Sequence, residues 1–250
     1  MSNKKQKMSS TIKHVLILVA MEAEAKPFVD SLGLAKSSPV HDKFSFETFA
    51  GTFRSIKVTV VVNGKCKTGV DNVGTTPAAI AAFAVIQIVQ PCLVINAGTA
   101  GGFCAKGAKI GDAFVSTLCR HHDRRIPIPG WDDYAFGHHP TLNVPQLCKA
   151  LGFKQGVVTT GNSLDYTPKD LELMLTNEAS VKDMEAAAIA WVCAHYDTPF
   201  FALKVVTDIV DGGRPSHEEF LENLGTAAKA LQEALPRCLE FVEGKALVEL

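Results

Sequence analysis

One stretch, residues 199–211 (PFFALKVVTDIVD), constrains the fold of this chain more than any other. Residues 200–206 form an apolar run that only Lys204 interrupts, which is typical of a strand buried on both faces in a parallel sheet. Thr207 and Asp208 follow at its end, and α/β sheets bind their ligands beyond the carboxyl ends of such strands. Asp208 is therefore a candidate site residue, although an aspartate that caps the next turn would give the same pattern.

Three other apolar runs also end in small or acidic residues. They are residues 14–20, 92–97 and 156–160. Because the carboxyl ends of neighbouring parallel strands lie at one edge of a sheet, we expect the side chains near these ends to meet in one cleft. The candidates are Glu24, Thr99, Glu185 and Asp208. Three carboxylates without a set of metal ligands indicate acid–base chemistry.

Helical and antiparallel patterns fill most of the remaining chain. Helices are predicted at residues 77–89, 186–196 and 216–242, a small-residue loop at 98–102, and an antiparallel pair at 44–50 and 56–62. Gly51 is the predicted turn of that pair. In the last helix, Ser216 and Glu219 have capping-box spacing, Pro236 predicts a kink or break, and no chemistry is expected. The pattern predicts an α/β fold with a largely parallel sheet.

The acidic candidates also have a purely structural interpretation. Glu22 and Glu24 enter a helix after the first strand, and Glu185 lies in the first turn of another, where negative charge stabilises the helix dipole. Asp183 suits the N-cap of that second helix. Glu22 and Glu24 are two positions apart and point in different directions, so one of them can face the sheet edge.

Three segments partly match known binding motifs, but each lacks a feature that its motif requires. Residues 63–69 (NGKCKTG) have glycines at P-loop spacing, but Val70 stands where a lysine is required. The glycines of 98–102 lead toward another strand instead of opening a helix, which disfavours a dinucleotide. His121 and His122 are adjacent and therefore diverge, so a charged loop or a subunit contact is favoured over a metal site.

Composition limits the class of protein. The 250 residues are 47% hydrophobic and carry a formal net charge of −1, which fits a single domain at 14–250 after a polar lead, 1–13, that we expect to be disordered. This charge favours no nucleic acid partner, and the longest apolar stretch, 78–89, is too short to span a membrane. Seven cysteines without a CxxC pair favour a reduced, cytoplasmic protein.

Five motifs together resemble one known family. They are AMEAEA at 20–25, NAGTAGG at 96–102, TGNSLD at 160–165, KDMEAAAIA at 182–190 and VTDIVD at 206–211. Over residues 14–242 the chain resembles the 5'-methylthioadenosine/S-adenosylhomocysteine nucleosidases, and HDRRIPIP at 122–129 is similar to their plant branch. The resemblance implies a three-layer nucleoside phosphorylase-like fold, a homodimer, no cofactor, and an adenine nucleoside as the small-molecule substrate.

The resemblance also implies roles for individual residues in hydrolysis of an N-glycosidic bond. Glu24 would be the base that activates water, and Asp208 the acid that protonates adenine N7. Glu185, with Met184 beside it, would bind the ribose hydroxyls. The remaining implied substrate-binding residues are Met21, Thr99, Ala100, Leu164, Asp165 through its backbone, Lys204 and Thr207.

Elementary chemistry makes demands on the two implied catalytic carboxyls. Departure of adenine needs an acid, while attack by water on the opposite face needs a base, so the two groups must differ in protonation. To be protonated near neutral pH, Asp208 needs a pKa raised by about three units, roughly 4 kcal/mol, which deep burial can supply. Glu24 must ionise readily, and Lys204 is a candidate positive neighbour.

Three residues depart from the bacterial pattern of the family. Asn162 stands where the family usually has aspartate, which puts the geometry of that loop in question. Leu164 replaces a stacking phenylalanine and Lys204 replaces an arginine. These two changes follow the plant pattern and bear on affinity and on which 5' group is accepted.

Two rival functions stay open from the sequence. A phosphorylase on the same fold would need basic groups for phosphate, for which Lys65 and Lys67 are candidates, whereas Glu24 favours water as the attacking group. A non-catalytic, nucleosidase-like storage or binding protein is the second rival, and the retained acids argue against it. If the chain is a dimer, the 124–134 segment is a candidate for contact with the partner's site.

Overall fold

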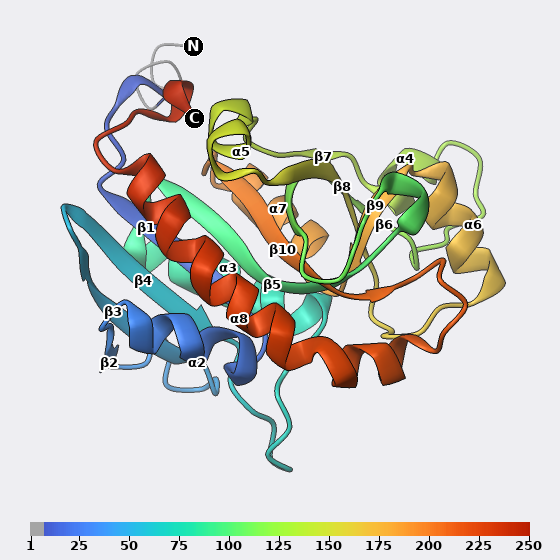
Figure 1. Cartoon of the computed structure of the whole chain (residues 1–250), viewed down its shortest axis with the longest axis horizontal. Coiled ribbons are helices and arrows are strands. Elements are labelled where there is room, and N and C mark those ends of the chain that lie inside the picture. The colour runs from blue at the N-terminus through green and yellow to red at the C-terminus, as the bar shows by residue number, and fades with distance from the viewer. Residues whose placement is uncertain (1–7) are drawn as a thin grey trace.

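The computed structural model describes residues 8–250, which form alternating strands and helices (Figure 1). The strands are β1 (His14–Val19), β2 (Ala35–Ser37), β3 (Glu47–Phe53), β4 (Ile56–Val62), β5 (Leu93–Gly102), β6 (Ala113–His121), β7 (His139–Pro140), β8 (Lys154–Thr160), β9 (Ala179–Asp183) and β10 (Phe200–Ile209). The helices are α2 (Glu22–Ser31), α3 (Thr75–Val89), α4 (Asp132–Phe136), α5 (Pro145–Leu151), α6 (Pro168–Thr176), α7 (Ala186–His195) and α8 (Ser216–Val242), with short 3-10 turns at Cys104–Lys106 and Leu247–Glu249.

The strands of this described part belong to one mixed sheet that closes on itself at one end. β10 pairs with β5 in parallel and with β6 in antiparallel orientation. β6, β8 and β9 continue in parallel, and β9 returns to β5. β1 and β4 extend the sheet in parallel beyond β5, and β3 and β2 finish it as an antiparallel edge. The predicted α/β class is confirmed.

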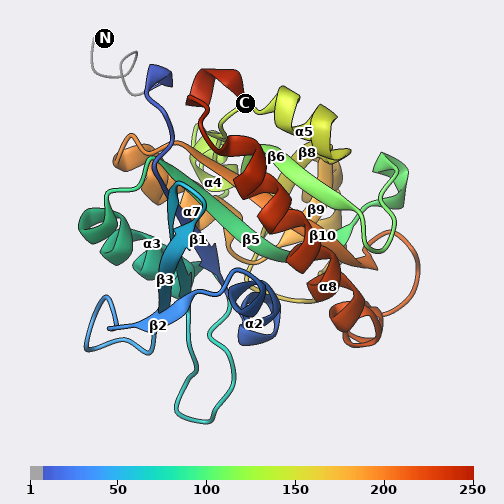
Figure 2. The ribbon, with the colours of Figure 1, turned by 60° about the vertical axis from the view of Figure 1, so that its left-hand side comes forward.

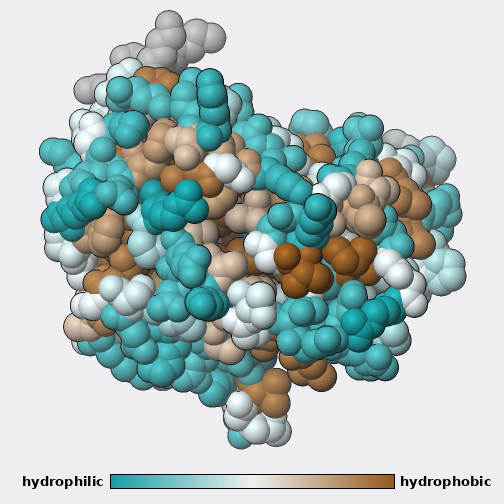
Figure 3. Space-filling model, in the orientation of Figure 1, coloured by the Kyte–Doolittle hydropathy of each residue, from teal (hydrophilic) through white to brown (hydrophobic). Residues whose placement is uncertain are grey.

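Helices cover both faces of the sheet, which gives the three layers expected of the family. Val15 and Ile17 of β1 pack in a core cluster with α2, α5 and α8, while Leu16 and Leu18 pack in a second cluster with α3 and α7. In Figures 1 and 2, α8 runs across one face of the sheet and α3 lies on the other. Figure 3 shows a mainly hydrophilic surface where α8 faces the viewer, so α8 buries only its apolar side.

The antiparallel pair is correctly predicted, but its turn is not. β3 runs through Gly51 to Phe53, and the chain reverses at Arg54, whose φ of 52° is left-handed, before β4 begins. Gly51 serves a different purpose, because a Cβ on it would lie 2.9 Å from Cδ2 of Leu34. The glycine permits close packing of Leu34 on the strand.

The predicted loop at 98–102 is wrong, because β5 continues as a strand to Gly102. Its glycines are needed for close approach and not for a turn. A Cβ on Gly102 would lie 2.6 Å from that of Ala108, and one on Gly98 would lie 3.1 Å from Glu24 Oε1. At Gly98 and Gly102 the absence of a side chain therefore lets the β5 backbone lie close to Glu24 and Ala108.

The last helix differs from its prediction in two ways. Pro215 is the N-cap of α8, and Ser216 forms no capping hydrogen bond; the Glu219 carboxylate accepts instead from the backbone N–H of Ile209 at 2.8 Å. Pro236 lies inside one continuous helix instead of ending it. The predicted capping box is wrong, and of the kink or break predicted at Pro236 the break is wrong, because contacts with β10 and the sheet outweigh the local signals.

Part of the predicted lead, residues 1–13, packs on the domain. Thr11 forms a bridge with Ala246, and Ile12 is buried with its N–H donating to Lys245 O at 2.9 Å. Residues 1–7 lie outside the described residues, so disorder there stays a prediction. No helix within 8–250 is both long and apolar enough to cross a membrane.

Candidate active site

A cavity of about 300 Å³ opens where β1, β5, β9 and β10 end. Its lining residues are Ala20, Met21, Glu24, Val70, Asp71, Val73, Thr99, Ala100, Gly101, Leu164, Lys182, Asp183, Met184, Glu185, Thr207, Asp208 and Phe220. The volume is at the lower end of the range for small-molecule sites. The carboxyl ends of these strands thus bring the separated motifs to one place, as the sheet topology predicted.

Glu24 reaches the cavity from the first turn of α2. Its side chain is 3% exposed, and Oε2 accepts from the N–H of Met21 at 3.2 Å. Oε1 accepts from the N–H and the hydroxyl of Thr99 at 2.6 and 2.7 Å. Burial raises the pKa of the Glu24 carboxyl, while the charge of Lys204 and the Thr99 hydrogen bonds lower it. Glu24 therefore lies in the first turn of α2, and hydrogen bonds from Met21 and Thr99 fix its carboxylate at the cavity.

Asp208 ends the buried part of β10 and is 4% exposed. Burial raises the pKa of its carboxyl above the ordinary value, and the Thr207 hydroxyl works against that rise. The Thr207 Oγ lies 2.8 Å from Asp208 Oδ1 and 3.2 Å from the Ala100 carbonyl oxygen. A hydroxyl has one hydrogen, so Thr207 donates it either to Asp208 Oδ1 or to the Ala100 carbonyl oxygen, and Asp208 Oδ2 takes no part in this contact. The contacts thus accommodate Asp208 in its acid form.

Glu185 shares a buried charge cluster with Asp183 and Lys204. The Lys204 ammonium lies 2.8 Å from Asp183 Oδ2 and 4.0 Å from Glu185 Oε2. Burial raises the Glu185 pKa to about 7, against the effect of Lys204. Burial also acts to raise the Asp183 pKa, but the ion pair with Lys204 outweighs it and holds that pKa low. Glu185 Oε1 additionally accepts from the N–H of Gly74 at 2.9 Å.

Most residues predicted for the site line the cavity, and two do not. Lys204 is 1% exposed and lies behind Asp183 and Glu185, so it acts on the cavity through its charge instead of through contact. Asp165 is exposed and outside the lining. Within residues 8–250, no group of three His, Cys, Asp or Glu side chains is placed to hold a metal ion. His122 instead has Nδ1 3.1 Å from the Thr159 hydroxyl.

This geometry agrees with the relationships of the chain to known proteins. A model of the phosphorylase superfamily matches residues 14–240. A 5'-methylthioadenosine/S-adenosylhomocysteine nucleosidase of Arabidopsis thaliana is 43% identical over 242 residues, which are 96% of this chain and 95% of the relative. The chain belongs to this nucleosidase family.

Solved structures agree with the family assignment. The apo structure of the Arabidopsis thaliana 5'-methylthioadenosine nucleosidase is 40% identical with a TM-score of 0.94, and the match covers 96% of this chain and 100% of that one. A 5'-methylthioadenosine/S-adenosylhomocysteine nucleosidase of Colwellia psychrerythraea, solved in complex with adenine, is 25% identical with a TM-score of 0.77, covering 95% and 99%.

Three side chains at the cavity, those of Lys182, Asp183 and Phe220, were not predicted from the sequence as site residues. Asp183 was predicted as the N-cap of α7, but the N-cap is Glu185. Asp183 Oδ2 accepts from the N–H of Ala186 at 2.8 Å and forms the ion pair with Lys204. Phe220 brings α8 to the cavity wall as an apolar side chain, a contact that the sequence did not predict. Lys182 lines the cavity beside Met184. The motif KDMEAAAIA contained Lys182 and Asp183, but its spacing alone did not indicate which side chains face inward.

Asn162, the residue that departs from the family pattern, joins two loops. Its Oδ1 accepts from the N–H and hydroxyl of Thr75 at 2.9 and 2.8 Å, at the start of α3. Its backbone N–H donates to Asp123 Oδ2 at 2.7 Å, and its Nδ2 is 3.2 Å from the same oxygen. An aspartate could repeat the first contacts but not the Nδ2 donation, so the amide fits a position facing Asp123.

Proposed function

We propose that this chain hydrolyses the N-glycosidic bond of 5'-methylthioadenosine to adenine and 5-methylthioribose, in methionine and S-adenosylmethionine salvage. The observation that carries the proposal is the pair of buried carboxyls, Glu24 and Asp208, which line one cavity from different elements. The activities named for the Arabidopsis relatives, at 43% and 41% identity, support the same reaction.

Asp208 acts as the acid in this proposal. Its raised pKa favours the protonated form, which donates to adenine N7 as the electron pair of the N-glycosidic bond moves to the base. Glu24 acts as the base that takes a proton from the attacking water. Burial raises the Glu24 pKa as well, but the charge of Lys204 and the donors of Thr99 oppose that rise and favour the ionised form.

The other lining residues are proposed to hold the substrate. Glu185, with Met184 beside it, accepts hydrogen bonds from the ribose hydroxyls, and Leu164 and Ala100 contact the adenine from the rim and floor of the cavity. Met21 and Thr207 complete this set, while Lys204 contributes through charge and Asp165 through its backbone. Support for these roles comes from the motif resemblance and from the position of each side chain.

Hydrolysis is favoured over phosphorolysis by the charges near the cavity. Phosphate would need cationic groups at the attacking position, but the carboxylate of Glu24 stands there. Lys65 and Lys67, the candidate phosphate ligands, are exposed on the 63–74 loop and do not line the cavity. The Lys65 ammonium lies 2.5 Å from Glu22 Oε2, with which it forms an ion pair.

The test is adenine release from methylthioadenosine by the pure protein in phosphate-free buffer. We expect full turnover with free 5-methylthioribose as product, and parallel reactions with S-adenosylhomocysteine, adenosine and inosine define the accepted 5' group and base. Strict dependence on phosphate, with a ribose 1-phosphate product, would establish a phosphorylase instead. Binding of the nucleoside in calorimetry without any adenine release would establish a non-catalytic binding protein.

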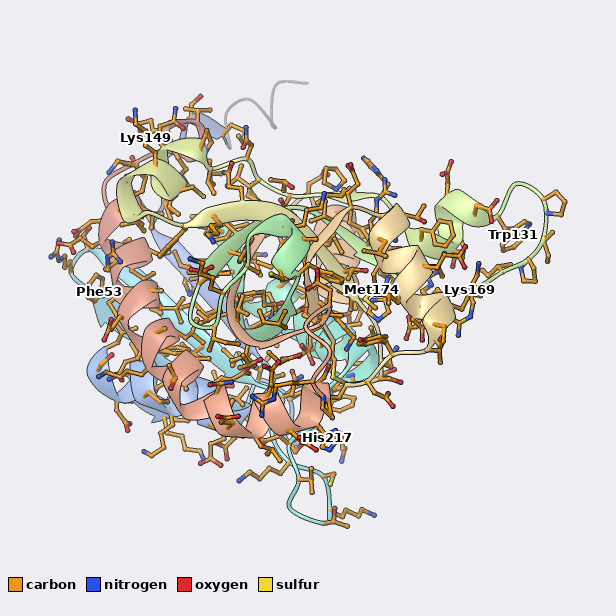
Figure 4. All side chains as sticks on the ribbon, turned by 45° about the vertical axis from the view of Figure 1, so that its right-hand side comes forward. Phe53, Trp131, Lys149, Lys169, Met174 and His217 are labelled. Atoms are coloured by element: carbon orange, nitrogen blue, oxygen red, sulfur yellow. The ribbon has the colours of Figure 1, made fainter. Side chains whose placement is uncertain are left out.

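We further propose a homodimer in which the 124–134 segment reaches toward the partner. In Figure 4, Trp131 stands at the outer end of a loop that projects from the body. Trp131 and Tyr134 are 47% and 61% exposed and pack edge to face with ring centres 5.8 Å apart, and exposed aromatics of this kind are common at interfaces. The predicted cytoplasmic location stays a prediction.

A further inference from the structure

Lys182 is a buried lysine that the proposed roles leave unexplained. It lies on β9, is 5% exposed and lines the cavity. Lysine is rarely buried without a partner, and here the ammonium donates to the carbonyl oxygens of Ser163 and Leu164, both at 2.8 Å. Leu164 is itself a cavity residue, so Lys182 ties the loop at the cavity rim to the strand beneath it.

The register of three strands places Lys182 opposite Asp208. Lys182 pairs with Gly101 of β5, and Gly101 pairs in turn with Asp208 of β10. Directly paired residues of neighbouring strands point to the same face of a sheet. The position between them carries no side chain, and a Cβ on Gly101 would lie 2.7 Å from Asp208 Oδ2. Gly101 therefore leaves the space across which Lys182 and Asp208 act on each other.

We infer that Lys182 is a positioning residue for the reaction, which holds the 163–164 backbone at the cavity rim and fixes a positive charge opposite the carboxylate formed when Asp208 releases its proton. The inference rests on the acid role proposed for Asp208. In that step the proton passes from Asp208 to adenine N7, and the negative charge left on Asp208 is stabilised by the nearby ammonium.

The charges around both groups determine the sign of the expected effect. Burial raises the Asp208 pKa, the Thr207 and Ser216 hydroxyls and the Lys182 charge lower it, and Glu219 of α8 raises it. Burial lowers the Lys182 pKa, and the carboxylates that oppose this are those of Asp208, Asp183, Asp165 and Asp123. Removing the Lys182 charge therefore raises the Asp208 pKa, so the acid form persists to higher pH.

The test compares Lys182→Met with Lys149→Met, an exposed control that also removes one positive charge (Figure 4). In Lys182→Met we expect KM for methylthioadenosine to rise about tenfold, because two charged hydrogen bonds to the rim are lost. We also expect the alkaline limb of the pH profile of kcat/KM to move to higher pH. Lys149→Met keeps the wild-type KM and profile.

Lys182→Arg separates the two tasks and covers the case in which the methionine variant fails to fold. Arginine keeps the charge but cannot repeat the ammonium geometry at both carbonyls, so KM rises while the alkaline limb stays in place. Wild-type KM in both variants, or an alkaline limb that does not move in a folded Lys182→Met, would overturn the inference. Either result leaves hydrolysis in phosphate-free buffer intact, which keeps it distinct from a failure of the proposed function.

Discussion

Glu24 and Asp208 are both withdrawn from water, yet their neighbours differ. Burial raises both pKa values. Glu24 has the Lys204 charge and two donors from Thr99, all of which favour the carboxylate. At Asp208 the Lys182 charge and the Thr207 and Ser216 hydroxyls lower the pKa, the Glu219 charge raises it, and burial decides the direction. Burial thus outweighs the neighbours at both carboxyls, and a full positive charge opposes it in each case, Lys204 at Glu24 and Lys182 at Asp208.

Gly101 is the residue on which the position of Asp208 depends. In Gly101→Ala the new Cβ would lie 2.7 Å from Asp208 Oδ2 and 2.8 Å from Val210 Cγ2, so the carboxyl must shift. We expect kcat/KM to fall by about 10²-fold, since a displacement of about 1 Å has this effect on a positioned group, with a loss of about 1–3 kcal/mol in unfolding free energy.

Gly225→Ala in α8 is the matched control for this change. A Cβ at Gly225 meets nothing within 4 Å, so activity stays at the wild-type level and the helix gains about 1 kcal/mol. Steady-state kinetics and urea denaturation measure both effects. Wild-type kcat/KM in Gly101→Ala would show that Asp208 is not fixed by this contact.

The elements show how far sequence alone predicts this structure. β10 and β1 were predicted closely because buried parallel strands have continuous apolar runs with clear ends. β5 was ended too early, because glycines usually stop a strand, and only the neighbours Ala108 and Glu24 explain why they continue one here. The capping box predicted for α8 likewise does not form, because the Glu219 carboxylate accepts from the N–H of Ile209 in β10 instead.

The candidate site was predictable in part for similar reasons. Strand ends located Glu24, Thr99 and Asp208, because topology alone brings strand ends together. The ion pair between Lys204 and Asp183 was not predictable, since it joins β10 to the end of β9 and depends on which way each side chain points. Lys182 was missed for the same reason, because its orientation follows from pairing with Gly101.

At the scale of the whole molecule, two buried histidines and two half-buried ones link stability to pH. Burial lowers the pKa values of His14, His121, His122 and His139 from 6.5 to about 4. Because the unfolded chain takes up these protons first, each contribution is fully present above about pH 6.5 and is lost as pH falls toward 4. The raised pKa values of Glu24, Glu185 and Asp208 act in the opposite direction.

The variant His122→Gln isolates the effect of one histidine. His122 is 2% exposed, and its shift corresponds to at most about 3 kcal/mol. We expect the difference in unfolding free energy between wild type and variant to be largest at pH 7–8 and to shrink as pH falls through 6.5 toward 4. Urea denaturation at several pH values measures it, and a difference independent of pH would contradict a neutral, buried His122.

The central claim is that Asp208, held buried at the end of β10, is the acid that protonates the leaving adenine. Asp208→Asn keeps the shape of the side chain but removes the proton donor. The most direct measurement is therefore adenine release by this variant, beside calorimetric binding of methylthioadenosine. We expect turnover to fall by at least about 10²–10⁴-fold with binding largely kept, and near-normal turnover in the variant would contradict the account.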